Sequence, residues 1–151
     1  MMQLSPHFTL AELCRTSQPF PNVPGLVQIA ALKQWCFNIG EPVRAHFGRP
    51  VKVNSGYRSL AVNRAVGSSD GSQHAKGEAS DIEIEGVSNA ELALWIRDNL
   101  RFDQLILEAY RPGVPGSGWV HVSFRLGRLR HSVLTMTMGS HGPVYSQGIN
   151  A

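Results

Sequence analysis

Three side chains in two short segments have the chemistry to hold a metal ion. His74 and Asp81 lie in the segment 72–81, and His121 lies in the segment 119–123. Two imidazoles and one carboxylate form a ligand set of catalytic zinc sites, in which the fourth position is left for water. The pattern therefore predicts a zinc ion held by His74, Asp81 and His121.

Short β-type runs lie beside these residues, so we expect a sheet to position them. Residues 79–84 are predicted to form a strand. Asp81 lies on one face of this strand, and the two isoleucines lie on the opposite face, which we expect to pack in the core. Residues 119–124 also alternate, and His121 shares a face with its second neighbours in that run. With His74 supplied by an adjoining loop, two neighbouring strands and one loop can bring the three ligands together.

The order of these residues resembles the signatures of the zinc D-Ala-D-Ala carboxypeptidases and peptidoglycan peptidases, the M15-like peptidases. The matching residues are Ser72, His74, Gly77, Ala79 and Asp81, then His121 and Ser123, and a third element, Ser55-Gly56-Tyr57-Arg58-Ser59 with Asn63. The opening residues 4–13 resemble small phage and prophage members, and the resemblance ends near residue 125. It implies an α+β fold of the hedgehog and D-Ala-D-Ala-peptidase type, a small, mostly antiparallel sheet with helices packed on one side.

Peptide hydrolysis also needs a general base, and many relatives carry an acid at about the position of Gly118. Glu108 is the best substitute. A symmetric hairpin that pairs residue 106 with 121 and 108 with 119 turns Glu108 toward the face of His121, about 7–8 Å away between β-carbons. A slip of one residue would turn Glu108 to the opposite face. Glu83, on the strand face of Asp81, is the alternative base.

Three further residues are candidates for substrate binding. In the family, the arginine that matches Arg58 binds a substrate carboxylate, and a guanidinium can hold a carboxylate through two hydrogen bonds. The alternative is that Arg58 pairs with a nearby acid for stability. The Ser72 hydroxyl can orient the site or contact the substrate, and Tyr57 can pack against the site or bind the substrate.

Periodicity and capping signals predict the remaining elements. Thr9 and Glu12 form a capping box for a short helix, and a longer helix runs from residue 26 and ends at Gly40. The C-terminal residues 125–151 receive no element, only packing of a few apolar side chains such as Met136. The other expected elements are helices at 41–47, 60–66 and 88–100, and strands at 50–54 and 103–108.

Length and composition indicate one globular domain, residues 1–151. Hydrophobic residues make up 42% and charged residues 17%, which is ordinary for such a domain. The net charge of +3 suits an anionic wall polymer, and no basic cluster indicates nucleic acid. No apolar run approaches the ~20 residues of a membrane helix. We expect a monomer without membrane insertion.

The N-terminus shows no signal peptide, so we expect synthesis in the cytoplasm and action on the cell wall after release. Cys14 and Cys36 are expected to be reduced thiols, with Cys36 buried on a helix face. Surface or capping roles are expected for the histidines outside the motifs, which are His7, His46, His131 and His141.

The resemblance and the residues together predict a zinc-dependent peptidase that cleaves peptidoglycan stem peptides, as a phage or prophage endolysin. A D-Ala-D-Ala carboxypeptidase or dipeptidase of bacterial wall metabolism remains open, as does a non-catalytic zinc-binding module that contacts the wall. A wall-binding or virion-attached protein with a secondary enzymatic role is a weaker alternative. The bond that is cleaved is left open.

Overall fold

A mixed sheet organises the chain. The structure is a computed structural model that describes residues 2–151. Within these residues, six strands lie in the order β3-β4-β6-β5-β7-β8, and every neighbouring pair is antiparallel except β5 and β7. The predicted α+β class is confirmed. The strands are β3 (Lys52–Ser55), β4 (Ala79–Glu83), β5 (Gln104–Glu108), β6 (Trp119–Ser123), β7 (Ser132–Gly139) and β8 (Gly142–Gln147), with a separate pair β1 (Gln3–Ser5) and β2 (Phe8–Thr9).

The helices begin where the capping signals predict. Thr9 Oγ1 accepts a hydrogen bond from the Glu12 amide at 3.2 Å, and the Glu12 carboxylate accepts from the Thr9 amide at 2.9 Å, which completes the capping box of α1. Ser88 Oγ likewise caps α5. No helix among residues 2–151 combines the length and apolar content needed to cross a membrane. The helical elements are α1 (Leu10–Leu13), α2 (Leu26–Trp35), η1 (Cys36–Gly40), α3 (Glu41–Phe47), α4 (Leu60–Ala65), η2 (Gln73–Lys76) and α5 (Asn89–Asn99).

The prediction that Gly40 ends the second helix is wrong. α2 continues through the π-helical turn η1 into α3, and Gly40 itself has helical φ and ψ angles of −59° and −52°. A β-carbon at this position would lie 2.8 Å from the ring of Phe8 and 2.9 Å from the ring of Trp35. Glycine is therefore used here for a close approach between aromatic rings, not as a helix terminator.

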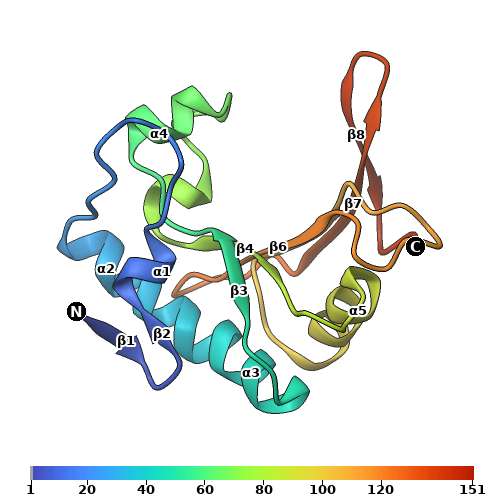
Figure 1. Cartoon of the computed structure of the whole chain (residues 1–151), viewed down its shortest axis with the longest axis horizontal. Coiled ribbons are helices and arrows are strands. Elements are labelled where there is room, and N and C mark those ends of the chain that lie inside the picture. The colour runs from blue at the N-terminus through green and yellow to red at the C-terminus, as the bar shows by residue number, and fades with distance from the viewer. Residues whose placement is uncertain (1) are drawn as a thin grey trace.

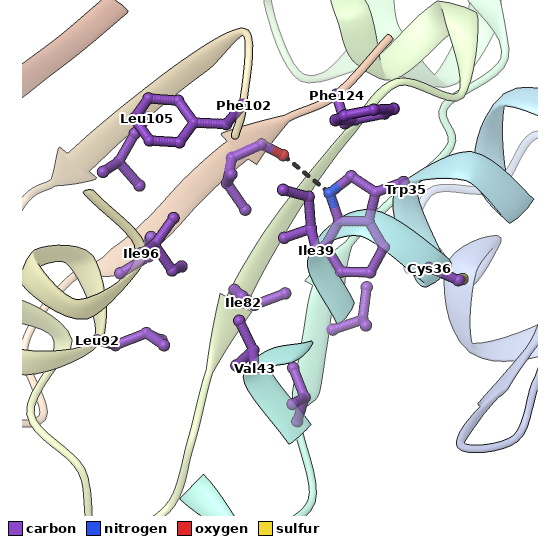
Figure 2. Packing of buried hydrophobic residues seen from close by; sticks show 14 of the residues in the cluster. Trp35, Cys36, Ile39, Val43, Ile82, Leu92, Ile96, Phe102, Leu105 and Phe124 are labelled. Atoms are coloured by element: carbon purple, nitrogen blue, oxygen red, sulfur yellow. Dashed lines mark hydrogen bonds between the residues drawn. The ribbon is translucent and has the colours of Figure 1, made fainter. Parts of the chain in front are cut away.

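The main hydrophobic core lies between one face of the sheet and the helices α2, α3 and α5. Figure 2 shows Trp35 and Ile39 on one side of Ile82 of β4 and Ile96 of α5 on the other side, and all four residues belong to one hydrophobic cluster. The Trp35 indole also donates a hydrogen bond to the Val122 carbonyl of β6 at 3.0 Å. These helices leave the opposite face of the sheet uncovered, and α4 and the hairpin β7–β8 rise on that side (Figure 1).

The C-terminal residues add two strands that the sequence analysis did not predict. β7 pairs in parallel with β5, and β8 folds back on β7. Asp103, which is 1% exposed, accepts hydrogen bonds from the Arg130 amide at 2.9 Å and from its guanidinium at 2.8 Å. The Asp103 carbonyl accepts from the Ser132 amide at 2.9 Å. This buried acid thus holds the start of β7 against β5.

The packing around Gly40 yields the first prediction. Replacing Gly40 by alanine should lower the free energy of unfolding by about 1–3 kcal/mol, because the added methyl overlaps two buried rings. Its better helix propensity offsets only about 1 kcal/mol of that cost. Urea denaturation measures the change. Gly116→Ala is the control, since a β-carbon there meets nothing within 4 Å, and equal stability of the two variants would contradict the prediction.

Candidate metal centre

The pairing of β4 with β6 brings two of the predicted ligands together. Asp81 and His121 are direct partners in this antiparallel pair, so their side chains share a face. His121 Nδ1 lies 3.0 Å from Asp81 Oδ1, and His74 Nε2 lies 3.4 Å from the same oxygen. The three ligand atoms all lie within 4.8 Å of one another. Ligand atoms of a tetrahedral zinc ion are separated by roughly 3.3 Å, so the arrangement fits such an ion.

Two hydrogen bonds position His74, one at its backbone amide and one at its imidazole ring. Ser72 Oγ accepts a hydrogen bond from the His74 amide at 3.2 Å and caps the 3₁₀ turn η2. His74 Nδ1 lies 2.8 Å from the Gly56 carbonyl, which can only accept, so Nδ1 carries the proton. Nε2 is therefore left with a free lone pair toward Asp81. A carbonyl that fixes the tautomer of a ligating histidine is a usual outer contact of metal sites.

The charges of the three groups are strongly coupled. Burial by itself raises the pKa of Asp81, yet His74 and His121 hold that pKa well below its usual range. Burial lowers the pKa of His74, and the Asp81 charge offsets this only in part. Burial also works to lower the pKa of His121, but the hydrogen bond and charge of Asp81 outweigh it, so the pKa is raised. Because histidine binds a metal through an unprotonated nitrogen, a cation would compete with the proton that this Asp81 interaction favours on His121.

Glu108 lies beside the three ligands. β5 and β6 pair Ile106 with His121 and Glu108 with Trp119, which is the register that the symmetric hairpin required. The Glu108 carboxylate reaches to 3.8 Å from His121 Nδ1, and its side chain is 16% exposed. Burial, and then the Asp81 charge, raise the pKa of Glu108 to about 7. A carboxyl that titrates near neutrality can both accept and return a proton.

A comparison with known proteins agrees with this arrangement. The sequence model of the Peptidase M15 family matches residues 6–123. The chain belongs to the M15 peptidase family. No curated protein matches it. All four residues, His74, Asp81, Glu108 and His121, lie inside the matched segment, whereas β7 and β8 lie outside it.

The conformation of Gly118 accounts for the missing acid just before the second histidine. Gly118 has a φ of +67°, and a β-carbon there would overlap the Glu108 carbonyl oxygen. No carboxylate side chain can therefore stand at this position without moving the β5–β6 turn. The site in this M15 peptidase instead has the carboxylate of Glu108, one strand away.

Glu83, the alternative base, is held by other groups. Asn54 Nδ2 donates to Glu83 Oε2 at 2.7 Å, and Asn89 Nδ2 donates to Glu83 Oε1 at 3.1 Å. Asn89 also donates to the carbonyls of Ser117 and Gly118 at 2.9 and 3.1 Å. Glu83 thus belongs to a polar cluster that supports the β5–β6 turn, and this favours Glu108 as the base.

The predicted substrate-binding residues have different surroundings. In the part of the chain that the structure describes, Arg58 forms no ion pair, and its Nε is buried without a hydrogen-bond partner. Its backbone amide donates a hydrogen bond to the His74 carbonyl at 3.0 Å, which places Arg58 beside the predicted ligands, and the charges of Asp81 and Glu108 act on its guanidinium. Tyr57 is 7% exposed and belongs to the hydrophobic core, which favours packing over substrate contact. Ser72 orients His74, as described above.

The other histidines and both cysteines lie outside this centre. Of the histidines, His7 pairs with Glu41, His46 stacks on Trp95 and His131 stacks on Phe102. Cys14 and Cys36 are free thiols, as expected, and burial raises their pKa values to about 11 and about 12. Among residues 2–151, the one His, Cys, Asp and Glu group with metal-ligand geometry is His74, Asp81 and His121.

Two features of the site were not foreseen from the sequence. The Gly56 carbonyl orients His74, and no side-chain pattern could reveal a backbone acceptor. The Trp119 indole Nε1 is buried and makes no hydrogen bond of ordinary geometry within residues 2–151, yet it acts on the neighbouring Glu108 carboxylate and works to lower its pKa. Because Trp119 is the register partner of Glu108, this donor lies on the face of the site. The alternation of residues 119–123 predicted this face for Trp119, but not that its indole nitrogen is buried beside Glu108.

The raised pKa of Glu108 gives a test of its burial. In the folded metal-free protein this carboxyl stays protonated up to about pH 7, whereas the unfolded chain ionises near 4.5. The stability cost of ionisation therefore grows between pH 4.5 and 7 and is complete above pH 7. Glu108→Gln should stabilise the metal-free protein by about 2–3 kcal/mol at pH 8 and by much less at pH 5, at about 1.4 kcal/mol per pH unit. Denaturation at both pH values measures this, and a pH-independent effect would contradict it.

Proposed function

We propose that the chain is a zinc-dependent peptidase that hydrolyses peptide bonds in peptidoglycan stem peptides. Membership of the M15 family indicates a peptidase for peptidoglycan-like substrates. The observation that carries the finer proposal is the Glu108 carboxylate, 3.8 Å from His121 Nδ1 at the edge of a three-ligand cluster. A closed structural metal site has four protein ligands and needs no such neighbour.

In this proposal His74, Asp81 and His121 hold the zinc ion. When bound, zinc polarises a carbonyl and lowers the pKa of a water molecule. Asp81 contributes a carboxylate that is already ionised, and His74 presents Nε2 because its Nδ1 is committed to the Gly56 carbonyl. His121 has to present an unprotonated nitrogen to the cation, which would take the place of the proton that the nearby Asp81 carboxylate favours.

Glu108 handles the protons of the reaction. Its carboxylate accepts a proton from the attacking water and delivers it to the amine that leaves the cleaved bond. Burial and the charge of Asp81 favour its protonated form, so the proton is retained long enough to be returned. A bound cation would favour the ionised form and thereby make Glu108 the better acceptor before the bond is broken.

Arg58 anchors the substrate. Its Nε is buried and has no hydrogen-bond partner among residues 2–151, and a substrate carboxylate can accept hydrogen bonds from the guanidinium. Stem peptides carry carboxylates, so one guanidinium can fix the peptide relative to the scissile bond. Burial lowers the pKa of Arg58, and the charges of Asp81 and Glu108 oppose that shift, while a guanidinium stays charged at any working pH.

We further propose that the biological setting is that of a phage or prophage endolysin, on the resemblance of residues 4–13 to small phage members. A D-Ala-D-Ala carboxypeptidase would use the same residues and would release single D-alanine. A non-catalytic zinc module would bind the wall without turnover. Mass spectrometry of muropeptides released from purified walls distinguishes these three outcomes.

Replacing Glu108 tests its proposed role as the general base. Glu108→Gln should keep one equivalent of zinc but lower kcat about 10²–10⁴-fold, because the general base is lost while the three ligands remain. Metal content by elemental analysis and muropeptide release measure the two effects. Chelation should abolish hydrolysis by the wild-type protein, and added zinc should restore it.

Glu83→Gln is the matched control, an acid to amide change in the neighbouring polar cluster. It should retain most of the activity. Loss of turnover in Glu83→Gln alone would make Glu83 the base. Full activity of Glu108→Gln, or wall lysis that survives complete zinc removal, would refute the mechanism.

Arg58→Gln tests the carboxylate anchor. The KM for stem peptides with free carboxylates should rise roughly 10–100-fold, the value of one charged hydrogen-bonding contact, while zinc content stays constant. The variant and the wild type should behave alike on peptides whose carboxylates are amidated. Arg64→Gln, which removes an exposed arginine paired with Asp70, is the control. An equal loss on free and amidated peptides would contradict the anchoring role.

A further inference from the structure

The C-terminal hairpin β7–β8 extends the face of the sheet that carries the site. It lies beyond residues 6–123, the segment shared with the M15 family. β7 is nevertheless the direct neighbour of β5, the strand that ends with Glu108. Figure 1 shows the hairpin rising on the side of the sheet opposite α3 and α5, with α4 rising at the other end. The hairpin therefore borders the site and lies on the same side of the sheet as the predicted ligands.

The strand registers put one tyrosine of this hairpin on the site face. Glu108 pairs with Trp119 on one side and with Met136 on the other, and Met136 pairs with Tyr145. Partners in a sheet share a face, so Trp119, Glu108, Met136 and Tyr145 form one row across four strands. Burial and the charge of Glu108 raise the pKa of Tyr145, in agreement with this placement.

The same side of the hairpin is apolar and open to solvent. Met136 is 6% exposed, whereas Tyr145 is 54% and Met138 is 66% exposed. Met138 lies two residues beyond Met136 on β7 and so shares its face. Apolar surface thus begins beside Glu108 and continues outward along the hairpin. Val144, 55% exposed, points to the opposite face and offers an internal comparison.

We propose that Tyr145 and Met138 form an extended substrate subsite, which binds stem-peptide residues remote from the scissile bond. This inference rests on the proposed function. From Trp119, beside the site on β6, to Tyr145 on β8 there are three strand spacings, about 14 Å in total. An extended peptide covers that distance with about four residues at about 3.3 Å each. The aromatic ring packs on the peptide, and its hydroxyl can donate to a peptide carbonyl.

Steady-state hydrolysis of purified peptidoglycan tests the subsite. Tyr145→Ala and Met138→Ala should each raise the KM for purified peptidoglycan about tenfold or more, with kcat little changed, since they remove binding and no catalytic group. Val144→Ala should stay within about twofold of the wild type. Thermal denaturation confirms that all three variants fold. Equal KM values for Tyr145→Ala and Val144→Ala would overturn the proposal, as would a large fall in kcat at constant KM.

A binding measurement separates this proposal from the proposed function. Glu108→Gln protein is mixed with purified wall sacculi and sedimented, with and without the Tyr145→Ala change. Loss of binding with Tyr145→Ala, but not with Val144→Ala, supports the subsite even if the wild-type protein hydrolyses nothing. If wall hydrolysis is observed but sedimentation is the same for both variants, the proposed function stands and the subsite is refuted.

Discussion

The buried carboxylate of Asp81, held between two imidazoles, is the constraint on which the site depends. One oxygen, Oδ1, is 3.0 Å from His121 Nδ1 and 3.4 Å from His74 Nε2. Its side chain is only 14% exposed, so the charge needs compensation from these neighbours or from a cation. The direct pairing of Asp81 with His121 in β4 and β6 supplies the first partner, and a slip of one residue would separate them.

The sheet can meet this requirement because its two faces have different surroundings. Helices α2, α3 and α5 cover one face, and alternate residues such as Ile82 and Val122 are fully buried there. The intervening residues of the same strands point to the uncovered face. The hydrophobic core thus fixes the register of the strands, and the register fixes the ligands. Stability and chemistry are divided between the two sides of one sheet.

The β5–β6 turn decides which carboxylate lies beside the three predicted ligands. The left-handed conformation of Gly118 excludes a side chain three residues before the second histidine. The same turn keeps the register that directs Glu108 toward His121. Asn89 supports it by bonding to the Ser117 and Gly118 carbonyls. The geometry of this turn therefore determines both the conformation of Gly118 and the position of the Glu108 carboxylate.

Residue types and spacing were sufficient to predict the three side chains that cluster at the site, most helices, the four strands β3 to β6, the capping box at Thr9 and the α+β class. These features depend on local alternation and short motifs, which a sequence displays directly. The register that aligns Glu108 was deduced only by assuming a symmetric hairpin.

The helix through Gly40 was predicted wrongly, because the reason for that glycine is the close approach of the ring of Phe8, which is distant in the sequence. The parallel strand β7 was missed altogether. Its partner β5 lies across a long connection, and the clamp between Asp103 and Arg130 that aligns them exists only once the chain has folded. Sequence alone thus determined which groups are present, whereas tertiary structure decided which of them meet, since such contacts depend on packing between segments far apart in the chain.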